Sequence, residues 1–167
     1  MGYRSDVGLV VAFESWDDMT EVLAVYKMSP LVQREEVLDH WTMYERSDGN
    51  GDGYCLMEYK TNDVKWYDDY DDVQAFRHLF KVVQQFAKER DGFKYAYKEL
   101  TVGEDGATTE DEGESCKKLG WVCDERMQIE PAQLTFNYDE SFKKLDKTEL
   151  GSSLTETEEK ENNHEAF

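Results

Sequence analysis

The pattern of hydrophobic and polar positions divides the first hundred residues into strand-like and helix-like segments. Asp6–Glu14 (DVGLVVAFE) is apolar at consecutive positions, which is typical of a central strand with elements packed on both of its faces. The following run, WDDMTEVLAVYKM, has helical spacing, and Ser15 with Asp17 and Asp18 makes a helix start. Pro30 interrupts this pattern and LVQREEVLDHW resumes it, so we predict two helical pieces with a break at the proline.

Two short aromatic runs and one long amphipathic run follow. WTMYER (41–46) and YCLMEYK (54–60) are bounded by turn residues and predict two strands. DDVQAFRHLFKVVQQFAKERDG (71–92) carries a continuous apolar stripe and ends in Asp-Gly, so it predicts a long helix. FKYAYKELTV (93–102) predicts a further strand, with Tyr95 and Tyr97 on one face.

The order of these elements predicts the fold class. The sequence β-α-β-β-α-β is that of the ferredoxin-like fold, an antiparallel sheet with helices on one face. We therefore predict an α+β protein with a ferredoxin-like core over residues 1–102. Residues 103–138 are predicted as an acidic loop (103–115) followed by a C-terminal β extension, in which AQLTFNY is the better strand candidate. Residues 139–167 are polar and predict a flexible acidic tail.

The segment SDGNGDGY between the two aromatic runs has features of an EF-hand calcium loop. Asp48, Asn50 and Asp52 stand where that loop places its first three ligands. Position 12 requires a bidentate Glu but is Tyr59, and the residues after the segment are typical of a strand rather than a helix. Asn50-Gly51 suits a hairpin turn because both residues accept positive φ. We predict a turn and no calcium site.

Composition predicts a folded and strongly acidic protein. The 167 residues include 38 Asp and Glu against 19 Lys and Arg, which gives a formal net charge of −19. Hydrophobic residues make up 39% and aromatic residues 13%, enough to build a core. Nucleic acids and anionic membranes require a basic footprint, so we expect neither as a direct partner. A basic protein would be attracted over a Debye length of about 8 Å at physiological salt.

Location is predicted from the absence of targeting patterns and from the cysteines. The longest apolar run is far shorter than the roughly 20 residues that cross a bilayer, and the N-terminus does not have the pattern of a signal peptide. Cys55, Cys116 and Cys123 form an odd set without the spacing of a disulfide framework, which predicts reduced thiols. We therefore expect a cytoplasmic protein.

No motif of catalysis or metal binding is found in the sequence. Cys116 and Cys123 are seven residues apart, and the histidines His40, His78 and His164 lie far from them in different elements. Nucleophile-elbow, phosphate-loop and HExxH patterns are missing as well. We predict no enzymatic activity, no cofactor and no metal. An enzyme of unknown type stays as a third hypothesis, which would need a pocket holding a group of displaced pKa.

The acidic residues are concentrated in a few segments. Asp at a helix start compensates the helix dipole, worth about 0.3–1 kcal/mol each, so part of the clustering has an ordinary explanation. We expect the two helix N-termini to share one edge of the molecule, so that their Asp clusters form one negative field. The predicted partner-binding residues are Asp17, Asp18, Asp68, Asp69, Asp71, Asp72, Glu104, Asp105, Glu110, Asp111, Glu112 and Glu114, together with the aromatic residues Trp66, Tyr67 and Tyr70.

Rows of carboxylates can imitate DNA, which carries about one negative charge per 1.7 Å of axis. The opening MGYRSDV, leading into an apolar strand, resembles the start of small bacteriophage accessory proteins. With its charge, the chain is similar in kind to acidic bacteriophage DNA-mimic proteins that inhibit host proteins. It is like Ocr in charge but not in fold, since Ocr is mostly helical, and no functional residue can be carried over.

The resemblance implies an inhibitor in the cytoplasm of an infected bacterial host. Its partner would be a basic DNA-binding host protein whose DNA groove it occupies: gyrase, a restriction enzyme, a nucleoid protein, RNA polymerase or a CRISPR complex. The alternative is an interaction or assembly protein that binds through an aromatic sheet face, with Tyr95 and Tyr97 exposed. High salt would weaken DNA mimicry but not that alternative. Two further possibilities stay open. The acidity could serve only solubility, and the chain could associate into a homodimer.

Overall fold

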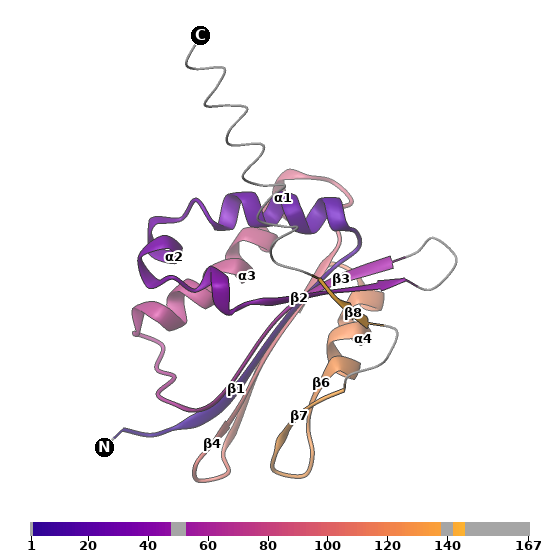
Figure 1. Cartoon of the computed structure of the whole chain (residues 1–167). Coiled ribbons are helices and arrows are strands. Elements are labelled where there is room, and N and C mark those ends of the chain that lie inside the picture. Colours follow the sequence, from indigo (N-terminus) through magenta and orange to yellow (C-terminus); the bar gives the residue numbers. More distant parts are fainter. Residues whose placement is uncertain (1, 48–52, 138–141, 146–167) are drawn as a thin grey trace.

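The computed structural model describes residues 2–47, 53–137 and 142–145 (Figure 1). The described residues form an α+β protein with an antiparallel sheet and four α-helices, and this class is as predicted. In chain order the elements are β1 (Ser5–Phe13), α1 (Trp16–Tyr26), α2 (Pro30–Glu35), the 3-10 turn η1 (Leu38–His40), β2 (Thr42–Ser47), β3 (Gly53–Val64), α3 (Asp71–Glu89), β4 (Tyr95–Gly103), β5 (Thr108–Glu114), α4 (Lys117–Arg126), β6 (Met127–Ile129), β7 (Leu134–Phe136) and β8 (Phe142–Lys144).

Six strands form the main sheet, in the order β5-β4-β1-β3-β2-β8, and every neighbouring pair is antiparallel. β6 and β7 form a separate two-stranded hairpin. The four strands expected from the sequence lie in the middle of the main sheet, and β5 and β8 extend it at its two edges. The strand order of the complete sheet therefore differs from that of the four-stranded ferredoxin-like sheet predicted above.

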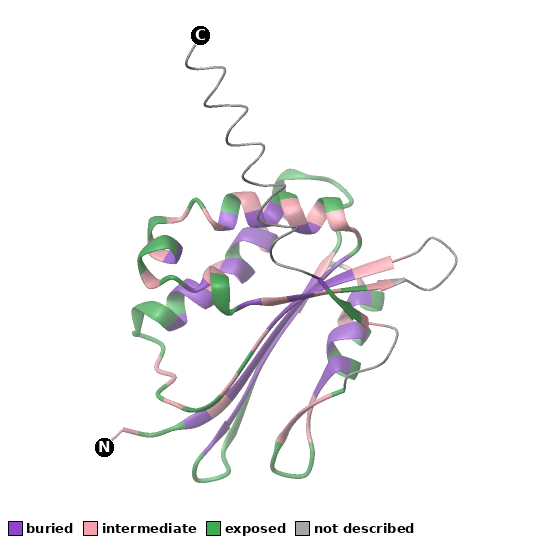
Figure 2. Ribbon diagram, viewed as in Figure 1, coloured by how far each residue is buried: buried purple, intermediate pink, exposed green. Residues whose placement is uncertain are grey.

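β1 is buried on both of its faces. Val7, Leu9 and Val11 belong to the larger core, which α1, α2 and α3 cover. Val10 and Ala12 face the other way, into a smaller core that α4 covers. Figure 2 shows β1 buried along most of its length, with helices on either side of it. The elements on both faces that the apolar run predicted are present, and within the described residues α4 is the helix on the second face.

The helix starts follow the predicted capping pattern. The Ser15 hydroxyl accepts a hydrogen bond from the Asp18 amide at 3.2 Å and caps α1. Ser29 caps α2 in the same way, and Pro30 stands in its first turn, so the predicted break at the proline is confirmed. α3 ends at Glu89, its C-cap Arg90 is extended, and Gly92 after it adopts a φ of 82°, so the helix stops just before the Asp-Gly pair, as predicted.

The acidic loop predicted for residues 103–115 is wrong, and the β extension predicted after it is confirmed only in its last part, by β6 and β7. The segment expected to be an acidic loop is a turn followed by strand β5, because Gly106, at a φ of 84°, folds the chain back so that β5 pairs with β4. The segment after it begins with helix α4, where a β extension was expected. Burial explains the helix, since Leu119, Val122 and Cys123 cover the second face of the sheet. The strand predicted in AQLTFNY is confirmed as β7.

Two further expectations fall partly outside the described residues. β2 and β3 pair antiparallel with Ser47 opposite Gly53, so the predicted hairpin is confirmed. Its turn residues, 48–52, lie outside the description. β8 pairs with β2 inside the segment predicted as a tail, and residues 146–167 are again not described. Within the described part, no helix is both long enough and apolar enough to cross a membrane.

A buried ion pair joins α4 to the sheet. Arg126, the last residue of α4, donates from Nε to the Glu58 carboxylate of β3 at 2.7 Å, and both side chains are buried. Its guanidinium lies over the Tyr44 ring at 4.5 Å and the Phe142 ring at 5.1 Å. Nη1 donates to the Asn137 carbonyl at 2.9 Å. One side chain thus connects α4 with β2, β3, β8 and the end of the β6–β7 hairpin.

Replacing Arg126 with Met should strongly destabilise the fold, because it leaves the Glu58 carboxylate buried without this cation. We expect the free energy of unfolding in urea to fall by about 3–5 kcal/mol. The double variant Arg126→Met with Glu58→Met should recover most of the loss, since no charge is then left in the site. As a control, Arg34→Met removes an exposed pair with Asp71 and should cost less than about 1 kcal/mol. Equal losses for both single variants would contradict the structural role of Arg126.

Candidate functional site

β5 carries a dense row of carboxylates. It is the end strand of the sheet, and Glu110, Asp111, Glu112 and Glu114 on it are all exposed. The register with β4 places the three glutamates on the face that α4 covers, and Asp111 on the face that α3 covers. Both sides of this edge are therefore negative.

The density of these charges along the strand axis, counted over both faces of the sheet, is close to that of one DNA strand, whereas the three glutamates on one face follow one another at about 6.6 Å. A strand rises about 3.3 Å per residue, so four carboxylates in the five residues 110–114 give one charge per about 4 Å. One strand of B-DNA carries one charge per about 3.4 Å of axis. β5 is hydrogen-bonded to β4 along its length, so the row is held on a rigid support.

Neighbouring basic groups neutralise only part of this charge. Lys98 on β4 lies between the strand and α4, with its ammonium 2.9 Å from the Asp124 carboxylate and 3.6 Å from that of Glu110. Partial burial, together with repulsion from Glu110 and Asp124, raises the pKa of Glu112 above its usual value. The carboxylates on this side therefore repel one another, and a cation placed among them would relieve that repulsion.

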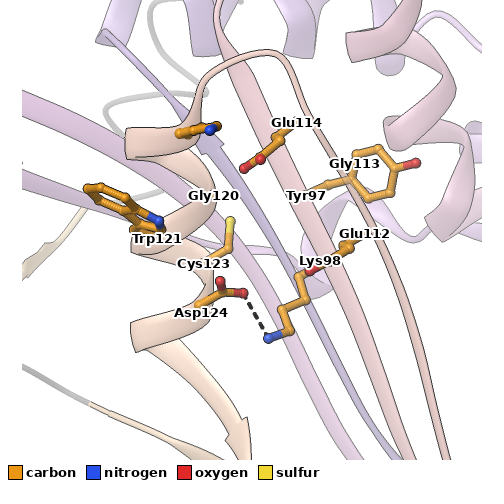
Figure 3. Close-up of a pocket in the computed structure, with 10 residues that line it drawn as sticks. Tyr97, Lys98, Glu112, Gly113, Glu114, Gly120, Trp121, Cys123 and Asp124 are labelled. Carbon is orange, nitrogen blue, oxygen red and sulfur yellow. Dashed lines mark hydrogen bonds and ion pairs between the residues drawn. The ribbon is translucent and has the colours of Figure 1, made fainter.

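A cavity of about 520 Å³ lies between β5 and α4. Figure 3 shows Glu112 and Glu114 entering it from β5, and Lys98 reaching across to Asp124. Trp121 stands at the rim on α4 and is 65% exposed. The space thus combines an acidic wall with an exposed aromatic side chain.

The Asp68–Asp72 segment is engaged in more local contacts than β5. Asp68 accepts from Arg77 Nη1 at 2.7 Å, and Asp71 lies 3.4 Å from Arg34. The Asp72 carboxylate accepts from the Val73 amide at the start of α3. Asp69 is exposed. Three of the four aspartates therefore have local partners, and the negative field here is weaker than their number suggests.

Two sets of contacts connect this segment with β4 and β5. Arg77 binds Asp68 and also the Glu99 carboxylate of β4, at 2.8 and 2.9 Å, and Glu99 stands opposite Asp111 on β5. At the nearby turn, the Tyr3 hydroxyl donates to Asp105.

The Tyr3 amide also donates to the Tyr67 hydroxyl at 2.6 Å. These contacts join the aspartate segment to the turn that leads into β5. The acidic surface, as the term is used below, consists of Asp68, Asp69, Asp71, Asp72, Glu104, Asp105, Glu110, Asp111, Glu112 and Glu114.

Asp17 and Asp18 lie at the other end of the sheet, so the prediction of a shared helix edge is wrong. α1 begins at the carboxyl end of β1, whereas α3 follows β3, which pairs antiparallel with β1. The two helices consequently run in opposite directions, and Arg90 after α3 forms an ion pair with Glu21 in α1. The nine residues of β1 separate the two ends by about 26 Å.

The three aromatic residues predicted beside the aspartates differ in exposure. Trp66 is partly buried against the ring of Phe76, at 5.8 Å, and its indole N–H donates to Glu99 at 3.5 Å. Tyr67 is partly buried and stands edge-on to Tyr70. Tyr70, at 38% exposed, is the most accessible of the three.

The aromatic sheet face expected in the alternative hypothesis is covered. Tyr97 is only 7% exposed and stacks on Phe80 of α3 at 4.3 Å, while its hydroxyl accepts from Gln84. Tyr95 is partly buried on the same face. Their predicted exposure is wrong, because α3 packs over this side of the sheet.

The sequence interpretation missed the contribution of α4. Trp121 and Asp124 reach the cavity because α4 is a helix. The sequence contained a signal for this helix. Leu119, Val122 and Arg126 are buried at helical spacing, which leaves Trp121 on the outer face. Because the segment was assigned to a strand, this helical spacing was not recognised.

The cysteines and His78 have the surroundings of structural residues. Burial raises the pKa of Cys55 to about 12 and also raises that of Cys123. Burial and nearby Lys81 lower the pKa of His78, whose ring stacks on Tyr26. Among the described residues, no group of three or more His, Cys, Asp or Glu side chains could hold a metal ion.

Thiol accessibility should follow burial. In the native protein we expect one thiol, that of partly exposed Cys116, to react rapidly with a thiol reagent such as dithionitrobenzoate. Cys55 and Cys123 should react only on the timescale of unfolding, because both are buried. Addition of guanidinium should release both slow thiols together. Rapid reaction of all three in buffer would contradict the packing of α4 on the sheet.

Neutralising Glu112 should stabilise the protein in a pH-dependent way. A raised pKa means that the folded chain binds this proton more tightly than the unfolded chain, so the stability contributed by Glu112 declines as pH rises through that pKa. Glu112→Gln should therefore raise the unfolding temperature near pH 7, and the gain should vanish once pH falls below the ordinary value of 4.5. The gain should be small because the side chain is exposed, and salt should reduce it.

Asp17→Asn is the matched control, since it removes the same charge from the first turn of α1, outside the row on β5. We expect it to lower the unfolding temperature slightly, because the carboxylate stands in the first turn of α1. A loss of stability in Glu112→Gln near pH 7 would contradict the proposed repulsion on β5.

Comparisons with known proteins provide no relative for this surface. The chain matches no protein-family model, no curated protein sequence and no solved structure. What the acidic surface can bind must therefore be inferred from its own charges and geometry.

Proposed function

We propose that this chain is a non-enzymatic binding protein that imitates DNA and occupies the basic groove of a DNA-binding protein. The observation that carries the proposal is the set of four carboxylates on β5, whose density along the strand axis, summed over both faces, approaches that of one DNA strand. In the setting suggested by the resemblance to bacteriophage proteins, the partner is a host protein of an infected bacterium. Gyrase, restriction enzymes, nucleoid proteins, RNA polymerase and CRISPR complexes are its candidate classes.

Rigidity supports this function. Charges on a flexible chain lose conformational entropy when a partner fixes them, whereas the carboxylates of β5 project from a strand already paired with β4. The net charge of −19 adds long-range steering toward a basic groove. The same charge disfavours nucleic acids and anionic membranes as partners.

The contact surface proposed here is narrower than the set of residues expected from the sequence. Asp17 and Asp18 are left out, because they stand in the first turn of α1, at the end of the sheet opposite the Asp68–Asp72 segment. Tyr70 and Tyr3, which are 38% and 37% exposed, supply aromatic contact area beside the aspartates.

We further propose that the support of this surface is a ferredoxin-like core made of β4, β1, β3 and β2 with α1 and α3. The order of these four strands and the position of both helices on one face support this. β5, α4 and β8 are additions to that core, and the acidic row stands on the first of them.

A second candidate function follows from β5 being an edge strand. Charged residues on a sheet edge prevent strand pairing between copies of a protein, and four carboxylates would do so without any partner. Under this alternative, neutralising β5 should cause self-association and should leave the binding of other proteins unchanged.

Capture from bacterial lysate tests the proposal. Tagged protein should retain a DNA-binding protein, identified by mass spectrometry, that excess duplex DNA releases and that added salt weakens. The double variant Glu112→Gln with Glu114→Gln should reduce its affinity about tenfold, which corresponds to about 1.4 kcal/mol. Asp17→Asn with Asp18→Asn removes the same charge elsewhere and should change affinity less than about twofold. Retention of a partner that duplex DNA does not displace would reject DNA mimicry.

A further inference from the structure

We propose that β5 accepts a seventh strand: an extended segment of the partner, with Lys or Arg at alternate positions, hydrogen-bonds along its open edge. This inference rests on the proposed function in so far as it takes the partner to be basic. It adds the mode of binding, which is strand addition rather than contact between charged surfaces alone.

The edge of β5 is regular enough to receive a strand. The seven residues of β5 pair with β4 without a register shift, and their sequence, TTEDEGE, contains no proline. In the described part of the chain, no strand lies on its outer side. Proteins protect such edges with bulges, prolines, coverings or charges. Of these devices, β5 uses charge.

The backbone groups that face outward can be identified from the pairing with β4. The Ser115 amide donates to the Tyr95 carbonyl, and the Gly103 amide donates to the Ala107 carbonyl. In an antiparallel pair, hydrogen-bonded and non-hydrogen-bonded positions alternate. The odd-numbered residues of β5 therefore bond to β4, and the even-numbered residues direct their N–H and C=O groups to the open edge. The even-numbered residues are Thr108, Glu110, Glu112 and Glu114.

Charge selects which strand can bind there. Opposite charges facing each other across neighbouring strands are favourable by roughly 0.2–1 kcal/mol per pair, and like charges repel. A strand with basic residues at alternate positions would pair them with the glutamates on the α4 face of the sheet. A second copy of β5 would bring carboxylates against carboxylates, so charge complementarity favours a basic partner over a second copy of this chain.

The cavity beside β5 gives the added side chains space. Alternate side chains of a seventh strand would extend on the same face as Glu112 and Glu114, next to the opening of about 520 Å³ (Figure 3). Asp124 stands on the far wall and Trp121 at the rim. A long guanidinium side chain entering this space would meet carboxylates, with an indole at the rim available for cation–π contact.

Two capped synthetic peptides of identical composition test the mode of binding. One alternates threonine and arginine, and the other has the same arginines in a single block. Strand addition predicts that the alternating peptide binds at least about fivefold more tightly, because only it can place an arginine opposite each glutamate. In the ¹⁵N-labelled protein, hydrogen exchange at the Glu110, Glu112 and Glu114 amides should slow on binding. Equal affinity for both peptides, with unchanged exchange, would overturn the proposal.

A proline on the open edge separates the hydrogen bond from the charge. Glu112→Pro removes an outward N–H while keeping the bonds to β4, and edge strands tolerate proline at such positions. Glu112→Pro should weaken binding of the alternating peptide about tenfold, whereas Glu112→Gln, which loses the same charge, should weaken its binding less than about threefold. Equal effects of the two variants would also overturn the proposal. Circular dichroism checks that Glu112→Pro folds, and the peptide comparison and exchange rates use the unaltered chain.

The outcomes for this inference and for the proposed function can be told apart. Binding of the alternating peptide to β5, together with a lysate partner that duplex DNA does not displace, would retain strand addition and reject DNA mimicry. A partner displaced by DNA whose affinity is the same for Glu112→Pro and Glu112→Gln would retain mimicry and reject strand addition.

Discussion

The whole arrangement depends on burying β1 on both faces. A strand that is apolar on both faces must be shielded from water on both faces, so a layer of helices has to cover each face of the sheet at β1. α1, α2 and α3 cover the face of Leu9 and Val11, and α4 covers that of Val10 and Ala12. The antiparallel pairing of β1 with β3 then sets the opposite ends of the sheet at which α1 and α3 start.

Covering both faces also determines where the charge of the protein can stand. Charged groups on a covered face must be paired, as Arg126 is with Glu58 and Arg77 with Glu99. The remaining carboxylates stand on the sheet edge, in the loops and on the outer sides of the helices. β5 belongs to that edge, which is why a strand without an apolar face is stable there: it gains backbone pairing from β4, and its side chains lose little solvation.

The elements of the first hundred residues could be predicted because each carries an apolar period of its own. α4 was missed because it has only ten residues, and its period depends on counting Arg126 as buried. β5 was missed because exposed edge strands lack apolar alternation, so TTEDEGE has the composition of a loop. The acidic residues themselves were identified, but their grouping was not, because the opposite directions of α1 and α3, which follow from the antiparallel pairing of β1 with β3, were not taken into account.

The carboxylates of β5 lie outside the packed core, and this has an evolutionary consequence. A residue on a covered face can change only with its neighbours, whereas Glu110, Asp111, Glu112 and Glu114 are exposed and contribute little to the packed core. These positions on β5 can therefore diversify one at a time while the scaffold stays constant. Under the proposed function, such a protein can follow a changing target quickly, because variation in its specificity is uncoupled from its ability to fold.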